Sequence, residues 1–284
     1  MAATLIDGKA IAASVRAEVK AQAAELLAHA GVRPGLAVIL VGEDPASRIY
    51  VRNKEKAAGE AGFLSRRIDL PAETEEQELL KAVERLNADS SIHGVLVQLP
   101  LPKHIDHAKV IRAIDPAKDV DGLNPVNAGF LFTGGVGFIP CTPYGVMRML
   151  DHEKVEIEGK HAVVVGRSNL VGKPAAMLLL SRNATVTICH SRTKDLPSVV
   201  RGGDIVIAAA GKARMVRGDW IKPGAVVIDV GINRDDQGNL CGDVAFDEAK
   251  QVAGAITPVP GGVGPMTVAM LLRNTYEAAA RSLK

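Results

Sequence analysis

A serine, a tyrosine and a lysine share one face of a predicted helix near the N-terminus. The helix lies in GEDPASRIYVRNKEKAAGEAG, where Ser47, Tyr50 and Lys54 have the spacing i, i+3 and i+7. This spacing directs all three side chains to the same side of a helix. A phenol beside an ammonium group can orient it and lower its pKa where water is partly excluded, so Lys54 is a candidate for acid–base chemistry. The spacing alone also fits a surface lysine that lies along a tyrosine.

A glutamine ends a later apolar run. In GVLVQLPLP, Gln98 lies near the carboxyl end of a predicted buried strand, where open α/β sheets bind ligands. The amide could hold Lys54 or a substrate, or it could be an ordinary satisfied amide.

The nearby sequence DPAKDVDG (115–122) gathers three carboxylates, but it lacks the ligand spacing of a calcium loop. His104 and His107 lack a third ligand at a useful spacing, and we predict no metal site.

A glycine-bearing turn joins the apolar run HAVVVG to an apolar helix. It reads GRSNLVGKP (166–174). Such a turn directs backbone N–H groups and the positive end of a helix dipole at a phosphate, which suits a dinucleotide. The match to GxGxxG is imperfect, because Ser168 replaces the second glycine and Gly172 comes one residue late, so an ordinary strand-to-helix turn also fits. The glycine spacing excludes a P-loop, and Leu170 excludes the GxSxG elbow of serine hydrolases.

The end of the next predicted strand indicates which dinucleotide would bind. NAD-specific sites carry Asp or Glu about 20 residues after the turn, to bond the ribose 2′-OH. Here the strand ends in HSRT (190–193), with no carboxylate. The Ser191 hydroxyl and the Arg192 guanidinium can bind a 2′-phosphate that a carboxylate would repel, which favours NADP. Taken alone, Arg192 also fits a solvated residue at the start of a helix.

Alternating strands and helices would position these residues. Apolar, β-branched runs predict strands at 36–42, 92–99, 161–166, 184–190, 204–210 and 225–231, and a further strand is predicted at 64–70. Periodicity and capping residues predict helices at 7–30, 46–61, 74–87 and 265–282, one that begins at Thr142, and one after each of the strands at 161–166, 184–190 and 204–210. Asp7 and Thr142 are predicted N-caps, and Thr74 and Gln77 are predicted to form a capping box. Residues 115–141 are rich in Asp, Asn, Gly and Pro and predict a linker or cleft-lining loop. The alternation indicates βαβ units and an α/β fold.

Length and composition fit a globular protein of about two domains. The 284 residues are 47% hydrophobic and 23% charged, and 34 basic against 32 acidic residues give a formal charge of +2, without basic clusters that would bind nucleic acid. No apolar run reaches the roughly 18 residues of a membrane span, and MAATLIDGK lacks a secretory signal, so we expect a cytoplasmic protein that binds neither nucleic acid nor membrane. Cys141, Cys189 and Cys241 form no CxxC pair, which indicates reduced thiols.

Six motifs in one order resemble the bifunctional methylenetetrahydrofolate dehydrogenase/methenyltetrahydrofolate cyclohydrolase family, the FolD family, along essentially the whole chain. They are VGEDPASRIYVRNKEKAA (41–58), GVLVQLPLP (94–102), KDVDGLNPVN (118–127), PCTPYG (140–145), VVGRSNLVGKP (164–174) and PVPGGVGPMT (258–267). The resemblance implies two βαβ domains with a cleft between them that holds folate against NADP. Residues 1–140, with the C-terminal helix from about 270 to 284, would form the folate-binding catalytic domain, and 141–269 a Rossmann-like NADP-binding domain. It also suggests a homodimer.

The same resemblance implies roles for single residues. Lys54 would be the catalytic lysine and Gln98 would hold it. Tyr50 would stack on the pterin side, and Asp121 would bind the amino-amide edge of the pterin ring. The other folate contacts would come from Ser47, Leu99, Pro260, Gly261 and Gly264. The NADP contacts would come from Gly166, Arg167, Ser168 and Gly172, from Ser191 and Arg192 at the 2′-phosphate, and from Ile232 at the nicotinamide.

The implied chemistry is an oxidation followed by a hydrolysis. Hydride leaves the methylene carbon of 5,10-methylenetetrahydrofolate for NADP⁺, and water then opens the methenyl cation to 10-formyltetrahydrofolate, a one-carbon donor used in purine biosynthesis. An ammonium beside that cation would be unfavourable, so we expect Lys54 to be neutral or to shuttle a proton during hydration. Two alternatives stay open: a dehydrogenase without cyclohydrolase activity, and a non-catalytic NADP-binding regulator with this fold.

Overall fold

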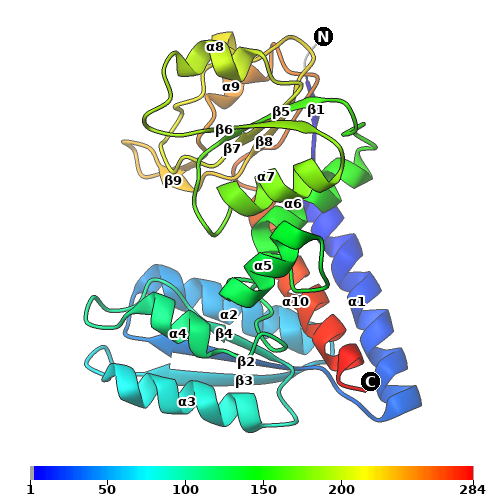
Figure 1. Cartoon of the computed structure of the whole chain (residues 1–284), viewed down its shortest axis with the longest axis vertical. Helices are drawn as coiled ribbons and strands as arrows, with labels where there is room; N and C mark the ends of the chain where they lie inside the picture. The colour runs from blue at the N-terminus through cyan, green and yellow to red at the C-terminus, as the bar shows by residue number, and fades with distance from the viewer. Residues whose placement is uncertain (1–2, 284) are drawn as a thin grey trace. The chain divides into compact units, whose positions relative to one another are not determined.

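The computed structural model describes residues 3–283, which form two compact units, each built on its own parallel sheet (Figure 1). One unit comprises the N-terminal residues as far as Ala12 together with Thr142–Thr267, and the other comprises Ala13–Cys141 and the residues from Val268 onward. Strands and helices alternate along both units, as the apolar runs predict, and the α/β class is confirmed. Within residues 3–283, no helix combines the length and hydropathy needed to cross a bilayer.

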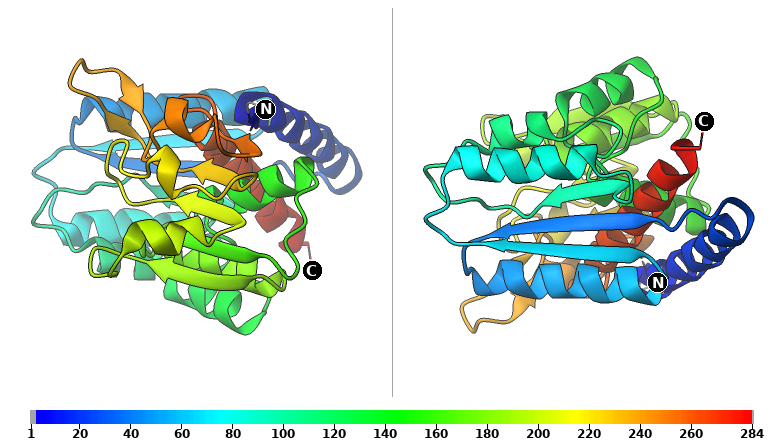
Figure 2. Two further views of the ribbon diagram at one scale, coloured as in Figure 1. Left: turned by 90° about the horizontal axis from the view of Figure 1, so that it is seen from above. Right: turned by 90° about the horizontal axis from the view of Figure 1, so that it is seen from below.

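The unit that contains Ala13–Cys141 has a three-stranded parallel sheet with the order β3-β2-β4. Its strands are β2 (Gly35–Val41), β3 (Leu64–Leu70) and β4 (Gly94–Val97), and its helices are α2 (Pro45–Glu60), α3 (Glu76–Ala88), α4 (His107–Ala113), α5 (Pro125–Thr133) and the larger parts of α1 (Gly8–Ala30) and α10 (Val263–Arg281). Every residue of β2 is buried, as a central strand covered on both faces requires. Figure 2 shows α2 on one face of this sheet and α3 on the other.

Helix α3 begins later than predicted. The predicted capping box of Thr74 and Gln77 is wrong, because the helix starts at Glu76 and its N-cap, Glu75, makes no side-chain cap hydrogen bond. Thr74 is buried in the preceding turn instead, where its carbonyl bonds His104 Nε2 at 2.9 Å. The apolar side of α3 packs on the sheet through Leu79, Val83 and Leu86.

The segment 115–141 contains a helix where a loop is predicted. Helix α5 begins with Asn124 as N-cap, whose side chain accepts a hydrogen bond from Val126 N, and with Pro125 in its first turn. It ends at Gly134, which has φ +76°. These are ordinary start and stop residues for a helix, so the prediction erred by reading Asn, Pro and Gly as loop formers.

Helices α1 and α10 complete this unit (Figure 1). Helix α1 begins as predicted, with Asp7 Oδ1 accepting from Lys9 N at 3.0 Å and Ala10 N at 3.1 Å. Arg273 on α10 donates to Glu18 on α1 at 2.6 Å. Asn274 donates to the carbonyl oxygens of Val120 and Ile139 at 2.8 and 2.9 Å, so the last helix of the chain fixes the loops on both sides of α5.

The other unit has a six-stranded sheet with the order β1-β11-β8-β7-β5-β6, in which every pairing is parallel. Its strands are β1 (Thr4–Leu5), β5 (His161–Val165), β6 (Thr185–Cys189), β7 (Ile205–Ala208), β8 (Val226–Asp229) and β11 (Ala255–Ile256). Its helices are α6 (Cys141–His152), α7 (Gly172–Ser181), α8 (Leu196–Arg201), the 3-10 helix η1 (Gly218–Trp220) and α9 (Phe246–Ala249). A separate hairpin is formed by β9 (Asn233–Arg234) and β10 (Leu240–Cys241). The sheet is Rossmann-like.

Two predictions about helices in this unit are wrong. No α-helix directly follows β7, where the chain forms a loop and then the three-residue η1. Helix α6 begins at Cys141, so Thr142 lies in its first turn and is not the N-cap. The Thr142 hydroxyl bonds the Thr267 hydroxyl at 2.9 Å, which links the start of α6 to α10.

Candidate active site

Helix α2 and strand β4 bring Lys54 and Gln98 into contact. Lys54 Nζ donates to Gln98 Oε1 at 2.9 Å, and Gln98 Nε2 donates to the Leu99 carbonyl at 2.6 Å. The second hydrogen bond fixes the amide with its oxygen toward the lysine. Both side chains are partly buried, and the pair lies at the carboxyl end of β4.

The surroundings of Lys54 favour its neutral form more than water would. Burial lowers the pKa of Lys54, because loss of water penalises the charged amine, and the negative charge of Asp121 opposes that shift. Cys141 is fully buried, and burial together with Asp121 raises the pKa of its thiol well above the usual value. The site therefore holds an amine that releases its proton more easily than a surface lysine, next to a carboxylate and a neutral thiol.

Asp119 organises the loop that carries Asp121. Its carboxylate is 1% exposed and accepts hydrogen bonds from Leu123 N at 3.2 Å, Asn124 N at 2.7 Å and Asn127 Nδ2 at 2.8 Å. Burial raises the pKa of Asp119 to about 6, although these donors oppose the shift. The Asp119 carboxylate thus fixes the backbone that follows Asp121. The only sequence signal for this was its place two residues before Asp121.

Ser47 and Tyr50 lie in different environments although they share α2. Ser47 is 3% exposed and bonds the Asp44 carboxylate through its hydroxyl and, at 2.7 Å, through its backbone N–H. It therefore helps to cap the helix. Tyr50 is 43% exposed, one turn before Lys54. Of the three residues predicted on this face, the second and third remain accessible to a substrate.

The glycine-bearing turn follows β5 at the carboxyl edge of the six-stranded sheet. Since β6 lies on one side of β5 and β7 on the other, the turn stands where the strand order reverses, which is where such sheets bind nucleotides. Gly166 has φ +133°, and a Cβ there would lie 2.0 Å from the Ala209 carbonyl oxygen. A Cβ on Gly172 would lie 2.2 Å from the Gly166 carbonyl oxygen. Both positions exclude a side chain, which lets α7 start close against the strand.

The residues around this turn fit NADP. Arg167 and Ser168 are exposed, and Ser168 Oγ accepts from Val171 N at 3.1 Å, which shapes the first turn of α7. At the end of β6, Ser191 and Arg192 are exposed. Arg192 N donates to His190 Nδ1 at 3.1 Å, which fixes the backbone of this exposed residue. A hydroxyl and a cation at this point suit a 2′-phosphate.

The remaining predicted contacts lie in the same unit as this turn. Ile232 follows β8 and is 55% exposed. Pro260, Gly261 and Gly264 lie between β11 and the first turn of α10, and Gly261 has φ +107°. Lys54, Tyr50, Gln98, Leu99 and Asp121 belong to the other unit. Among residues 3–283, no three His, Cys, Asp or Glu side chains are grouped to hold a metal ion.

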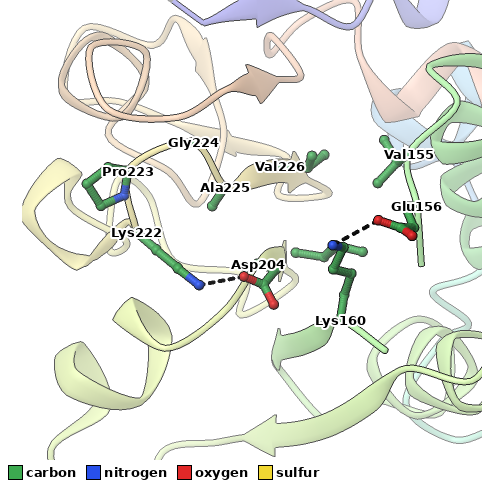
Figure 3. A pocket seen from close by; sticks show the side chains of 10 residues that line it. Val155, Glu156, Lys160, Asp204, Lys222, Pro223, Gly224, Ala225 and Val226 are labelled. Atoms are coloured by element: carbon green, nitrogen blue, oxygen red, sulfur yellow. Dashed lines mark hydrogen bonds and ion pairs between the residues drawn. The ribbon is translucent and has the colours of Figure 1, made fainter. Parts of the chain in front are cut away.

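A cavity of about 320 Å³ lies at the opposite, amino edge of the six-stranded sheet (Figure 3). Its charged groups are paired, Lys222 Nζ with Asp204 at 2.6 Å and Lys160 Nζ with Glu156 at 2.9 Å. These pairs neutralise the cavity, and nucleotides bind at the carboxyl edge of such sheets. We therefore do not assign the nucleotide to this cavity.

Two family models match the chain. Residues 6–121 match the catalytic domain of tetrahydrofolate dehydrogenase/cyclohydrolase, and residues 140–283 match its NAD(P)-binding domain. The chain is 61% identical to the bifunctional protein FolD of Bordetella avium, over 100% of this chain and 99% of the relative. It is also 61% identical to that of Moorella thermoacetica, over 99% of this chain and 100% of the relative.

Solved structures agree. The bifunctional methylenetetrahydrofolate dehydrogenase/cyclohydrolase of Campylobacter jejuni has a TM-score of 0.97 and 48% identity, covering 99% of this chain and 100% of its own. The corresponding enzyme of Trypanosoma brucei, solved with NADP and an inhibitor, has a TM-score of 0.95 and 45% identity, covering 100% of this chain and 99% of its own.

Proposed function

The chain belongs to the tetrahydrofolate dehydrogenase/cyclohydrolase family, and from this membership we propose the reactions and residue roles that follow. It is an NADP-dependent methylenetetrahydrofolate dehydrogenase and a methenyltetrahydrofolate cyclohydrolase. It oxidises 5,10-methylenetetrahydrofolate to the 5,10-methenyl cation, and it hydrolyses that cation to 10-formyltetrahydrofolate. The observation that carries the proposal is the partly buried Lys54–Gln98 pair beside Asp121, within the part of the chain that matches the family's catalytic domain.

Bound NADP⁺ supplies the hydride acceptor for the first step. Its phosphates are held by the turn after β5, through Gly166, Arg167, Ser168 and Gly172. Ser191 and Arg192 bind the 2′-phosphate, and the exposed residue Ile232 faces the nicotinamide through its backbone. The exposure of the turn and of Arg192, and the absence of a carboxylate in HSRT (190–193), support this assignment.

The folate is bound and oriented by Asp121 and Tyr50. Asp121 accepts hydrogen bonds from the amino-amide edge of the pterin ring, which matches the two oxygens of a carboxylate. Tyr50 stacks on the pterin side, which its 43% exposure permits. Leu99, Pro260, Gly261 and Gly264 complete the folate contacts, whereas Ser47, which is 3% exposed and caps α2, is left out of them.

Lys54 moves the proton in the hydrolysis. Water adds to the methenyl carbon, and its proton passes to the neutral Lys54 amine. The C–N5 bond then breaks as Lys54 returns this proton to N5, and the remaining hydroxyl proton is released to solvent as the carbonyl forms. The lowered pKa of Lys54 supports this role, because a neutral amine can take a proton and does not repel the cation. Gln98 holds the amine in place through the 2.9 Å hydrogen bond.

The domain roles, location and assembly extend the proposal. Residues 1–140 with the C-terminal helix bind folate, and 141–269 bind NADP. We place the protein in the cytoplasm, which its free, buried Cys141, Cys189 and Cys241 support, since thiols stay reduced there. We also propose a homodimer, as the family resemblance suggests, and a role for its product in purine biosynthesis.

One assay tests the proposed function. The purified chain is given 5,10-methylenetetrahydrofolate with NADP⁺ or NAD⁺, and reduced cofactor and methenyltetrahydrofolate are followed together. We expect NADPH to form with little methenyl accumulation after spontaneous hydrolysis is subtracted. Persistent methenyltetrahydrofolate would leave a dehydrogenase alone, and no reduction of either cofactor would favour a non-catalytic NADP-binding regulator.

A further inference from the structure

We infer that Asp243 is a positioning residue for the dehydrogenase reaction, because its buried carboxylate ties together the loops that follow β7 and β8 at the carboxyl edge of the six-stranded sheet. This inference rests on the proposed function, in which that edge binds NADP. Asp243 lies after β10, in the segment CGDVAF (241–246). It is not among the residues that the sequence motifs single out.

The Asp243 carboxylate fills a pocket of backbone donors. Its Oδ2 accepts from Ala210 N at 2.5 Å and from Gly211 N at 2.9 Å, and its Oδ1 accepts from Lys212 N at 2.8 Å. Three successive N–H groups make an anion-binding concavity. Asp243 is 0% exposed, so this concavity holds the protein's own carboxylate and is closed to a ligand. The loop after β7 is thereby fixed.

The same carboxylate also holds the loop after β8. Asn233 Nδ2 donates to Asp243 Oδ1 at 2.8 Å. A Cβ on Gly231 would lie 2.4 Å from that oxygen and from the Asp243 nitrogen, so the backbone before Ile232 is pressed against Asp243. Ile232 itself is 55% exposed. The residue proposed to face the nicotinamide is therefore flanked on both sides by contacts to Asp243.

A second buried carboxylate holds Asp243 in place. Asp229, the last residue of β8, is 3% exposed and accepts from Gly231 N, Asp243 N and Val244 N, each at 2.9 Å. A Cβ on Gly242 would lie 1.8 Å from Asp229 Oδ2, so only glycine fits there. The segment that carries Asp243 is thus locked to the end of β8.

The contacts of Asp243 should affect the oxidation and not the hydrolysis. The loop after β7 packs against the phosphate-binding turn, since a Cβ on Gly166 would lie 2.0 Å from the Ala209 carbonyl oxygen. Hydride transfer requires close placement of its two partners, and a misplacement of about 1 Å can cost about 100-fold in rate. Hydration of the methenyl cation is assigned to Lys54 and does not use these loops. Loosening them would therefore impair the oxidation selectively.

The test is Asp243→Asn in the full chain. An amide keeps the shape, but its NH₂ group must face backbone or side-chain donors on one side. We expect kcat/KM of the dehydrogenase to fall by about 10- to 100-fold, mainly through kcat. Affinity for NADP⁺, measured by calorimetry, should change less, because the phosphates are held by the turn after β5. Hydrolysis of 5,10-methenyltetrahydrofolate without NADP⁺ should stay at the wild-type rate.

Asp204→Asn is the matched control. The Asp204 carboxylate also accepts from a backbone N–H, that of His161 at 2.9 Å, but it lies at the amino edge in the cavity of Figure 3. We expect neither activity to change. If Asp243→Asn does not fold, Asn233→Ala removes one donor to Asp243 and should produce the same selective loss at smaller size.

Two results would overturn the inference: a parallel fall of both activities in the variant that folds, or an unchanged dehydrogenase. A wild-type chain that lacks both activities would instead refute the proposed function, so the two failures are distinguishable.

Discussion

The Lys54 amine donates a hydrogen bond to the Gln98 side-chain oxygen across 2.9 Å, and the Gln98 amide nitrogen is in turn held by the Leu99 carbonyl. This relay joins helix α2 to the end of strand β4. It orients the amine without giving it a formal negative partner in direct contact. An uncharged partner leaves the lowered pKa of Lys54 in place, whereas a carboxylate in the same position would raise it.

Removal of the Lys54 amine should abolish most of the hydrolysis. We expect Lys54→Met to lower the cyclohydrolase kcat by about 10²- to 10⁴-fold, the usual contribution of a positioned acid or base. Lys56→Met is the control, because Lys56 is on the same helix with its side chain 76% exposed and pairs only loosely with Glu60 at 3.8 Å. Full cyclohydrolase turnover in Lys54→Met would refute the assigned role.

The pH dependence of the hydrolysis should move in opposite directions in two Gln98 variants. The neutral amine is the active form, and its share grows as pH rises through the pKa of Lys54. Gln98→Glu places a carboxylate beside the amine and should shift the cyclohydrolase pH profile to higher pH, with less activity near neutrality. Gln98→Leu removes an acceptor that favours the ammonium and should shift it to lower pH. Profiles of kcat against pH test this, and shifts of the same sign in both variants would contradict it.

The Arg192 guanidinium should determine the preference for NADP⁺. We expect Arg192→Ala to raise the KM for NADP⁺ by about tenfold or more, since a charge-assisted contact with the 2′-phosphate is lost, while kcat stays near normal. The KM for NAD⁺, which has no 2′-phosphate, should not change. Lys194→Ala, at another exposed cation two residues away, is the control. An unchanged KM for NADP⁺ in Arg192→Ala would remove the assignment.

Asp119 should make stability fall as pH rises. Burial raises its pKa from 3.8 to about 6, so the folded protein binds more protons than the unfolded chain between these values. Its contribution is therefore complete below pH 3.8 and is lost as pH rises through 6, by about 3 kcal/mol for a shift of about two units.

Urea unfolding of wild type and Asp119→Asn, at intervals from about pH 4 to 7.5, measures this loss. The wild type should lose stability relative to the variant across that range. Asp69→Asn is the control for loss of an exposed carboxylate, since its side chain is 58% exposed. A constant difference between wild type and Asp119→Asn at all pH values would contradict the prediction.

The strands of both sheets follow from local sequence, because a buried parallel strand needs a continuous apolar, β-branched run. The run HAVVVG (161–166), for example, contains the whole of β5. Strand β3 is predicted with its own bounds, 64–70, although none of its residues is buried. Strand β1 at the edge of the six-stranded sheet and its neighbour β11 are not predicted, since each has only two residues, which carry no periodic signal, and their pairing joins Thr4 to Ala255. Helix α5 could have been predicted from Asn124, Pro125 and Gly134, had these been read as capping residues.

The site residues also divide into those that the sequence predicts and those that only the folded structure reveals. The helical spacing predicts Lys54, the strand end predicts Gln98, and the glycine-bearing turn predicts the nucleotide site. The sequence could not reveal that the Gln98 oxygen faces the lysine, which depends on the Leu99 carbonyl. Nor could it reveal Asp243, because the backbone donors at 210–212 become its neighbours only through folding. The donors to Asp119 are close in sequence, but its burial depends on the packing of the folded unit.

The interleaving of the two units fixes when each can be finished during synthesis. The unit made first, around β2, remains open until α10 supplies Arg273 and Asn274 from nearly the end of the chain. The six-stranded sheet likewise needs β11 before β1 can pair at its edge. Almost the whole chain must therefore be synthesised before either unit can complete its fold. A truncated chain would contain neither a completely folded folate-binding unit nor a completely folded nucleotide-binding unit.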